Sequence, residues 1–326
     1  MDRYAPSYSL TNTMLMLTAD IAERLGAGIS LRSLESKPNL CWDCHLRSVF
    51  ASSAIEGKAL SLDNVTDIIT GRKKVPCAQE DIQEVQNLYR AYEMLGQFDP
   101  YSFHDLKKIN AVMTGMTAQS PELFRSTNGT VFNGEERIFN PPPPQEISGR
   151  LDALFGWLTT NRGQIHPLIL STIFHFELYF IFPFSEGNGY MARLWQMAIL
   201  SDWKPLFRHI PVESEIYRFL GGYYHHFPSE MNSFIEFMLD KINLSVAWIA
   251  KQIMGDNTAP SRAVQKLLHA MEQNVSYSAL QLMELLNLTS RSNFWKLYLN
   301  PALEQGLIMM SVPDKPTSKN QMYIKC

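Results

Sequence analysis

Apolar residues recur at every third or fourth position along most of the chain, which is the spacing of helices with one buried face. Only the segment 117–146 and the C-terminal end depart from this spacing. Ser61 and Pro167 are suited to the start of a helix, and Gly71 to its end. The pattern therefore predicts a mainly α protein. Its expected helices span Asn39–Ile55, Leu62–Thr70, Glu80–Leu95, Phe103–Met116, Ile147–Thr160, Pro167–Phe180, Asn188–Trp203, Glu213–His226 and Ser229–Met254.

The interruption at 117–146 contains Gly129, Gly134 and four successive prolines at 141–144. Residues 129–133 and 137–140 flank a polar turn, which predicts a short, exposed β-hairpin followed by a polyproline stretch. The free edge of such a hairpin can pair with an extended partner chain. An ordinary surface loop fits the spacing equally well, so both interpretations stay open.

The C-terminal end reads as a separate module behind a linker. Its three helices and two strands are expected at 262–273, 277–286, 290–304, 307–312 and 321–324, with a basic turn between the strands. Three helices followed by a β-hairpin are typical of a winged helix-turn-helix.

Composition excludes some classes of protein. With 45% hydrophobic and 19% charged residues, the chain has enough apolar material for a sizeable core. Its net charge of −3 gives no overall bias towards nucleic acid or membrane. The N-terminus lacks a basic leader and no apolar run approaches 18 residues, so we expect a cytoplasmic protein without a membrane span. Cys41 and Cys44 form a lone C-x-x-C, which favours free thiols over zinc or redox chemistry.

Candidate chemistry concentrates at residues 182–193, which read Phe-Pro-Phe-Ser-Glu-Gly-Asn-Gly-Tyr-Met-Ala-Arg. Gly187 and Gly189 bracket Asn188 where a helix should begin, and the free N–H groups of a first helical turn bind phosphate. Arg193 lies about one turn further and could reach the same anion. The carboxylate of Glu186, beside phosphates, is suited to Mg²⁺. A glycine pair that only shapes a tight turn is the simpler alternative.

This segment resembles the motif H-P-F-x-[D/E]-G-N-G-R-x-x-R of the Fic (Fido) family. The matching positions are Pro183, Phe184, Glu186, Gly187, Asn188, Gly189 and Arg193. The resemblance extends to the helical surroundings, the hairpin before the motif and the proline run. It implies a mainly α fold: a Fic helical core with a small β-hairpin flap, joined to a C-terminal winged helix-turn-helix. The expected parts are an N-terminal helical region (1–100), the Fic core (101–254), a linker (255–260) and the winged helix (261–326).

An upstream segment, Ser52 to Gly57, resembles the [S/T]-x-x-x-E-[G/N] motif of self-inhibited Fic proteins. The inhibitory helix would span about 40–57. A Glu56 carboxylate placed against Arg193 would occupy the guanidinium and repel the terminal phosphate of ATP. A solvated charge at the end of a helix is the alternative interpretation of Glu56 alone.

The resemblance further implies AMP transfer from ATP to a protein hydroxyl, with ATP and Mg²⁺ as the cofactors. Glu186 would hold the metal, the backbone at 187–189 would cradle phosphate, and Arg193 would clamp the distal phosphate. The flap would dock the target segment by strand pairing. Its docking residues would be Val131, Phe132, Ile138 and Phe139.

Two positions depart from the motif. Phe182 stands where the family has the histidine that acts as general base, and Tyr190 stands where it has the first arginine. Phenylalanine has no titratable group, and losing a positioned base typically costs about 10²–10⁴-fold in rate. His175 lies two turns upstream, too far for direct proton transfer, and His166 is expected to cap or pack at a helix start. We expect Phe182 to fill the vacated space as part of the core.

Residues 261–326 carry seven Lys or Arg against four Asp or Glu, a local net charge of +3. The cations expected on the recognition helix and the wing, where they suit DNA contacts, are Arg291, Lys296, Lys315 and Lys319. Winged helices also bind proteins, so the type of partner stays open.

Three hypotheses follow. The first is a bacterial, cytoplasmic Fic-family protein built as a protein adenylyltransferase but impaired at the base and held in check by Glu56. The second is a non-enzymatic regulator whose winged helix binds duplex DNA while the Fic core senses a nucleotide or partner. The third is an interaction scaffold that works through its flap. The target protein and the oligomeric state, a homo-oligomer included, do not follow from the sequence.

Overall fold

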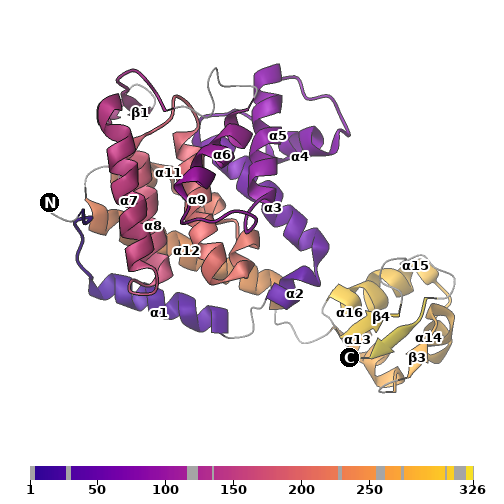
Figure 1. The fold of residues 1–326 in the computed structure, drawn as a ribbon. Coiled ribbons are helices and arrows are strands. Elements are labelled where there is room, and N and C mark those ends of the chain that lie inside the picture. The colour runs from indigo at the N-terminus through magenta and orange to yellow at the C-terminus, as the bar shows by residue number, and fades with distance from the viewer. Residues whose placement is uncertain are drawn as a thin grey trace. The chain divides into compact units, whose positions relative to one another are not determined.

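The computed structural model describes residues 4–26, 31–115, 124–133, 136–226, 230–254, 261–272, 275–304, 307–311 and 321–325. The chain forms two compact units, Met1–Ala250 and Lys251–Cys326 (Figure 1). Helices dominate both units, which confirms the predicted mainly α class. Among the described helices, none combines the length and the apolar character needed to cross a bilayer.

Unit 1 is a helical assembly with a small β-hairpin. Its longer helices are α1 (Asn12–Gly26), α3 (Pro38–Ile55), α4 (Leu62–Thr70), α5 (Gln79–Glu93), α6 (Phe103–Thr114), α7 (Ile147–Asn161), α8 (Pro167–Ile181), α9 (Asn188–Trp203) and α12 (Met231–Met254). The shorter elements are α2 (Leu31–Glu35), α10 (Val212–Arg218), α11 (Leu220–His226) and 3₁₀ turns at Pro144–Glu146 and Pro205–His209.

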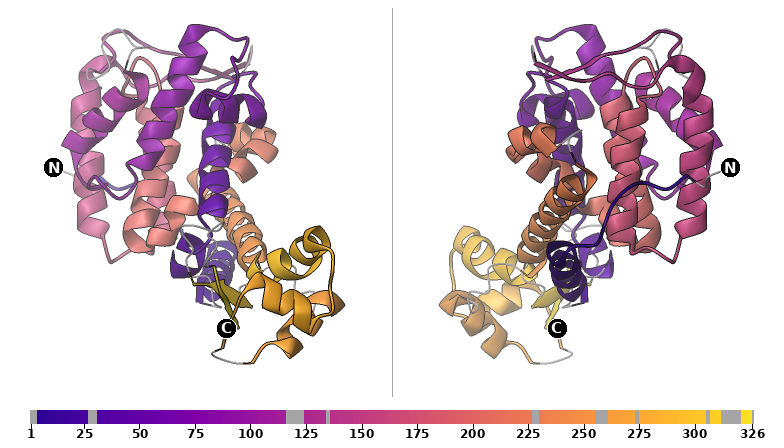
Figure 2. Two further views of the ribbon diagram at one scale, coloured as in Figure 1. Left: turned by 90° about the vertical axis from the view of Figure 1, so that its right-hand side faces the viewer. Right: turned by 90° about the vertical axis from the view of Figure 1, so that its left-hand side faces the viewer.

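The centre of unit 1 is built from α8 and α9, with α7 beside α8 (Figures 1 and 2). Every residue of α9 from Asn188 to Ser201 is buried, and α8 is apolar around most of its circumference. A helix that is apolar on all sides needs neighbours on all sides, which explains the central position of this pair. The loop that carries the sequence motif joins these two helices, so it is held by the most buried part of the unit.

The signals that start and end helices act as the sequence predicts. Ser61 forms a reciprocal capping box with Asn64, and Gly71 ends α4 in a left-handed conformation. Pro167 lies in the first turn of α8, and α9 spans the predicted Asn188–Trp203. One expected helix, 213–226, is wrong as a single element, because it breaks at Phe219 ahead of two glycines, which disfavour helix.

The hairpin consists of β1 (Val131–Asn133) and β2 (Glu136–Phe139), paired antiparallel with Val131 opposite Phe139. The expectation of an exposed hairpin is wrong for these two predicted docking residues, whose side chains are 4% and 9% exposed. Phe139 stacks on Phe180 of α8 at a centroid distance of 5.6 Å. Because strand side chains alternate, the same register leaves Phe132 exposed. One face of the hairpin therefore belongs to the core.

Unit 2 contains α13 (Arg262–Ala270), α14 (Ala279–Leu285) and a third helical segment. It also has a three-stranded antiparallel sheet of order β3 (Ser276–Tyr277), β5 (Tyr323–Lys325) and β4 (Ile308–Met310). The sequence missed β3, because Tyr277 was expected in a helix. Ser278 instead caps α14 through a reciprocal box with Gln281, which places Tyr277 outside the helix.

The third helical segment of unit 2 is irregular. It runs through α15 (Arg291–Phe294), a π-helical turn at Trp295–Leu299 and α16 (Asn300–Glu304). Pro301 lacks an N–H and its ring crowds the carbonyl four residues earlier, so the regular hydrogen-bond ladder cannot continue there. A π-turn just before the proline accommodates this interruption.

Candidate functional site

The loop between α8 and α9 is shaped by two left-handed residues. Phe182 ends α8 at φ 49°, and Gly187 precedes α9 at φ 78°. The Asn188 side chain accepts from Phe184 N at 2.9 Å and donates to Phe184 O at 2.8 Å. This side chain therefore closes the loop, which leaves Asn188 with its backbone N–H, among the free amides of the first turn, as a group that could bind an anion.

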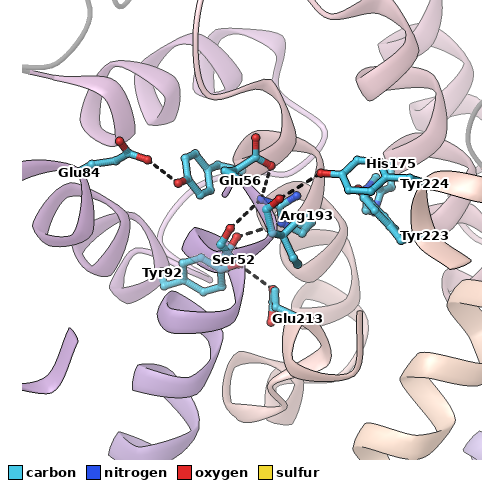
Figure 3. A network of polar contacts seen from close by, with 11 residues as sticks. Ser52, Glu56, Glu84, Tyr92, His175, Arg193, Glu213, Tyr223 and Tyr224 are labelled. Carbon is cyan, nitrogen blue, oxygen red and sulfur yellow. Dashed lines mark hydrogen bonds and ion pairs between the residues drawn. The ribbon is translucent and has the colours of Figure 1, made fainter. Parts of the chain in front are cut away.

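Arg193 lies in the interior of unit 1, one turn into α9, with a side chain that is 1% exposed. Its Nη2 donates to the Glu56 carboxylate at 2.7 Å and to Ser52 O at 3.2 Å, and its Nε donates to Ser52 Oγ at 3.0 Å (Figure 3). Burial opposes the charge, but Glu56 together with the neighbouring Tyr223 and Tyr92 outweighs it, so the pKa of Arg193 is raised.

The Glu56 carboxylate also lies against the N-terminal turn of α9. A Cβ at Gly189 would collide with it, so glycine is needed for this close approach. The carboxylate is 28% exposed and sits where the helix dipole and the free amides favour an anion. Glu56 thus lies where the first turn of α9 favours an anion. Glu56 itself caps the C-terminal end of α3, and Gly57 follows it at φ 83°.

A buried polar layer lies next to Arg193. Glu213 of α10 is 1% exposed and accepts from Tyr92 OH at 2.7 Å (Figure 3). It also accepts from Ser48 Oγ at 2.9 Å. Burial raises the pKa of Glu213. Sequence analysis missed this group, because its members come from three helices and carry no local signature.

A hollow of about 360 Å³ opens beside the Glu56 carboxylate. Its lining comes from the end of α3, the first hairpin strand, the motif loop and α11. The lining residues are Ala54, Ile55, Glu56, Gly57, Thr130, Val131, Phe132, Tyr179, Phe182, Ser185, Glu186, Gly187, Asn188, Gly189, Leu220 and Tyr224. The volume lies in the range of small-molecule sites, and the lining combines aromatic rings with an anion-binding helix end. Lys and Arg do not occur among these described lining residues.

Phe182 is not the core residue that the sequence predicts. It is only partly buried and lines the hollow, with its ring 5.8 Å from that of Tyr179. Among the described residues that line the hollow there is no histidine. These described lining residues therefore offer no imidazole at the position of the missing base.

The side chain of His175 bonds to Gln196 and Tyr223 in the interior of unit 1. It is fully buried, with Nδ1 2.6 Å from Gln196 Oε1 and Nε2 2.9 Å from Tyr223 OH. Gln196 donates its amide to Thr172, so its oxygen accepts from His175 Nδ1–H, and the imidazole is neutral. Burial lowers the pKa of His175 to about 3. His166 caps α8 by accepting from Leu168 N, as predicted.

The neutral, buried His175 predicts acid sensitivity. Its pKa is near 6.5 in the unfolded chain and about 3 in the fold, so between these values the unfolded chain binds the extra proton. Stability is therefore lost as the pH falls below 6.5, by about 2 kcal/mol between pH 7 and pH 5. Urea unfolding of wild type and His175→Gln at both pH values tests this. The pH-dependent loss should shrink by that amount in the variant, and an unchanged loss would contradict the assignment.

Arg125, which the sequence analysis overlooked, ties the hairpin to the motif loop. This arginine is 7% exposed, and its guanidinium donates to Phe182 O at 2.7 Å, to Thr127 O at 2.9 Å and to Pro142 O. Thr127 precedes β1 and Pro142 follows β2, so one side chain joins both legs of the hairpin to the end of α8.

Replacing Arg125 with methionine is expected to lower the free energy of unfolding by about 3 kcal/mol, because buried carbonyl groups lose their donors. It should also make the hairpin more susceptible to limited proteolysis under native conditions. Arg137→Met, at an exposed hairpin position, serves as the matched control. Equal protection of the hairpin in Arg125→Met and Arg137→Met would show that Arg125 does not hold it.

A metal ion fits this site only together with a ligand. Glu186 is exposed at the mouth of the hollow, and Mg²⁺ commonly combines one or two carboxylates with substrate phosphates. In the part of the chain that the structure describes, no cluster of three or more His, Cys, Asp or Glu could hold a metal alone. Cys41 and Cys44 are free thiols, and burial raises the pKa of Cys44 to about 12.

In unit 2, Arg291 and Lys296 are exposed and line a hollow of about 560 Å³. Ser292, Trp295, Asn300 and Pro301 complete its lining, which includes no acidic residue among those described. The other two cations predicted to contact DNA, Lys315 and Lys319, lie outside the described residues.

Comparisons with known proteins match both units of the chain to one family. The model of the Fic/DOC family matches residues 100–200, and that of the "Filamentation induced by cAMP protein Fic-like, C-terminal domain" matches residues 262–324. "Protein adenylyltransferase Fic" of Nematostella vectensis is 25% identical over 205 residues, which cover 60% of this chain and 46% of that protein. "Protein adenylyltransferase fic-1" of Caenorhabditis elegans is 26% identical over 179 residues, 52% of this chain and 34% of that protein. The chain thus spans less than half of either relative.

Solved structures extend the likeness to nearly the whole chain. The crystal structure of a Fic family protein from Desulfovibrio desulfuricans G20 is 33% identical, covers 99% of this chain and 98% of its own, and superposes with a TM-score of 0.72. A Fic domain containing signaling protein from Bacteroides thetaiotaomicron VPI-5482 shares the fold, with a TM-score of 0.60 at 16% identity over 76% of this chain and 98% of its own. With this similarity along its full length, the chain belongs to the Fic family.

Proposed function

We propose that unit 1 binds a magnesium nucleotide in the hollow beside α9 and that Glu56 controls access to it. The observation that carries the proposal is the Glu56 carboxylate lying on Arg193 and against the first turn of α9. An anion is already held where a phosphate would bind, so a nucleotide has to displace it. Glu186 is placed to hold Mg²⁺ beside the phosphates, where the metal would neutralise part of their charge.

We propose further that the chain is built for AMP transfer to a protein hydroxyl but is impaired in that reaction. The names of the adenylyltransferase relatives and the shared motif support the reaction class. Phe182, which has no proton-accepting atom, supports the impairment, as does the neutral, buried state of His175. The exposed Phe132 and, among the described residues, a sheet of only two strands are suited to pairing with an extended target segment.

Calorimetric titration of Mg²⁺–ATP into wild type and Glu56→Gly tests the nucleotide pocket. The expected result is binding by the variant that is at least about 10-fold tighter than by wild type, since one buried charge pair no longer competes. Adding Arg193→Met to the variant should abolish the gain. An absence of binding to all three proteins would overturn the proposal.

The second candidate function is duplex DNA binding by unit 2, where helices and a small sheet suit a winged helix-turn-helix. The observation that favours it is the basic hollow around Trp295, in a stretch with no Asp or Glu between Glu284 and Glu304. Binding of the full chain to a DNA duplex should weaken steeply with salt and be lost in Arg291→Gln/Lys296→Gln. Arg262→Gln, on the exposed side of α13, is the matched control. A DNA affinity that changes neither with salt concentration nor with the double substitution would exclude this function.

A further inference from the structure

Tyr190, which stands where the family motif has an arginine, belongs to a chain of polar contacts between three helices. Its side chain is buried in the first turn of α9, and its hydroxyl donates to Glu84 Oε1 of α5. The other oxygen of Glu84 accepts from Lys58 Nζ at 2.9 Å, and Lys58 also bonds to Asp81 at 2.8 Å. The chain of contacts therefore runs from α9 through α5 to Lys58, which lies in the turn after α3, three residues past its last residue, Ile55.

Lys58 lies two residues after Glu56, close enough along the backbone to affect the position of the Glu56 side chain. Gly57 turns the chain in a left-handed conformation, and Lys58 N donates back to Ser53 O at 3.1 Å. Residues 56–58 thus form one tight turn. Asp81 and Glu84 of α5 hold the ammonium group of Lys58 at one end of this turn. This attachment limits where the Glu56 carboxylate, at the other end of the turn, can move.

Tyr190 also lies beside the other partner of Glu56. Its ring centre is 5.4 Å from the guanidinium carbon of Arg193, one helical turn away on α9. A cation over an aromatic face is attracted to it. The same tyrosine therefore contacts the arginine through its ring and restrains the Glu56 segment through its hydroxyl.

A role for Lys58 as a replacement phosphate ligand is less consistent with these contacts. Two carboxylates hold its ammonium group, and it does not line the hollow among the described residues. Moving Lys58 to a phosphate would leave Glu84 and Asp81 without this cation. The contacts favour restraint of Glu56 over direct binding of the ligand.

We propose that Tyr190 and Lys58 are positioning residues that hold Glu56 against Arg193. This inference rests on the proposed nucleotide pocket. The substitution of the motif arginine then has a consequence beyond a lost cation, because the tyrosine strengthens the contact that blocks the phosphate position. A nucleotide must displace Glu56 together with the turn that Lys58 anchors.

The test measures Mg²⁺–ATP affinity for Tyr190→Phe and Lys58→Met, each with Glu56 present and in the Glu56→Gly background. With Glu56 present, each substitution should tighten binding roughly 3- to 10-fold, the equivalent of one hydrogen bond. In the Glu56→Gly background, neither should change the affinity by more than about 2-fold. Equal effects in both backgrounds, or none with Glu56 present, would overturn the inference. If Glu56→Gly itself binds no nucleotide, the proposed function fails instead.

A second measurement does not depend on the nucleotide. The amides of Gly57 and Lys58 bond to Ala54 O and Ser53 O, so their hydrogen exchange reports on the turn. Tyr190→Phe should speed this exchange at least about 3-fold, because local opening becomes easier. Tyr4→Phe, which removes a comparable hydroxyl bond to Glu177, is the matched control and should leave it unchanged. Exchange that is unaffected by Tyr190→Phe would overturn the inference whatever the affinities show.

Discussion

Replacing Glu56 with glutamine is expected to lower the free energy of unfolding by about 3 kcal/mol. Arg193 is 1% exposed, so the substitution leaves a buried cation without its counter-charge. Glutamine keeps the shape of the side chain and an oxygen that can accept from Nη2, which isolates the effect of the charge. A loss of about 3 kcal/mol is at the lower end of the range for breaking a buried ion pair, because the Glu56 side chain is 28% exposed and already partly solvated.

Urea unfolding of unit 1 in the full chain measures this loss, with Glu186→Gln as the matched control. Glu186 is an exposed carboxylate in the same region, so its neutralisation should change stability by less than about 0.5 kcal/mol. Inorganic phosphate should then raise the unfolding midpoint of Glu56→Gln but not that of wild type, because a ligand stabilises the state that binds it. Equal stability of wild type and Glu56→Gln would mean that the ion pair does not hold this region.

The loss of stability and the gain of ligand affinity have one cause. A buried arginine is costly without an anion, and Glu56 supplies one from within the chain. Under the proposed function, the residue that stabilises the free protein is therefore also the residue that blocks its ligand.

The helices that form the site follow from local signals. The glycine pair and the apolar run after it predict a helix that starts at Asn188 and ends at Trp203, and α9 has these bounds. Ser61 and Gly71 likewise set the ends of α4. Helix starts and ends depend on residues within a few positions of one another, so they can be predicted from a single sequence.

Contacts between distant segments do not follow in the same way. Arg125 bonds to carbonyl groups on both legs of the hairpin and at the end of α8, and any buried acceptor would attract a guanidinium equally well. Glu84 sits on an amphipathic helix among several acidic residues, and nothing nearby singles it out as the partner of Tyr190. The resemblance to a family motif directs attention to residues that the family retains. It says little about a network built around a residue that departs from the motif.

Phe182 is a second position at which neighbouring residues in the sequence mislead. The apolar residues around it predict a core position, yet its backbone ends α8 at a positive φ and its ring faces the hollow. A bulky residue is uncommon in this conformation, whereas histidine is several-fold enriched there. The backbone at position 182 is therefore compatible with the side chain that the motif expects.

Restoring histidine by Phe182→His is accordingly expected to be tolerated by the fold but to give little AMP transfer on its own. The imidazole would supply a base at the hollow, yet Glu56 would still lie where the phosphate binds and position 190 would still lack a guanidinium. The combination Phe182→His/Tyr190→Arg/Glu56→Gly removes all three obstacles. We expect it to exceed wild type by at least about 10²-fold, the lower end of what a positioned base contributes, while Phe182→His alone stays within about 10-fold of wild type.

Transfer of label from α-phosphate-labelled ATP to protein measures both rates, with the chain itself and an added cell extract as acceptors. The combination carrying Arg193→Met in addition is the control, since it keeps the base but loses the buried cation of the phosphate position. Substantial transfer by Phe182→His alone would contradict the prediction, because it would show that Glu56 and Tyr190 leave the pocket open to ATP. Transfer that persists in the Arg193→Met control would place the chemistry outside this hollow. The expected ordering, with activity only in the combination and its loss with Arg193, requires base, cation and free phosphate position to act together at the start of α9.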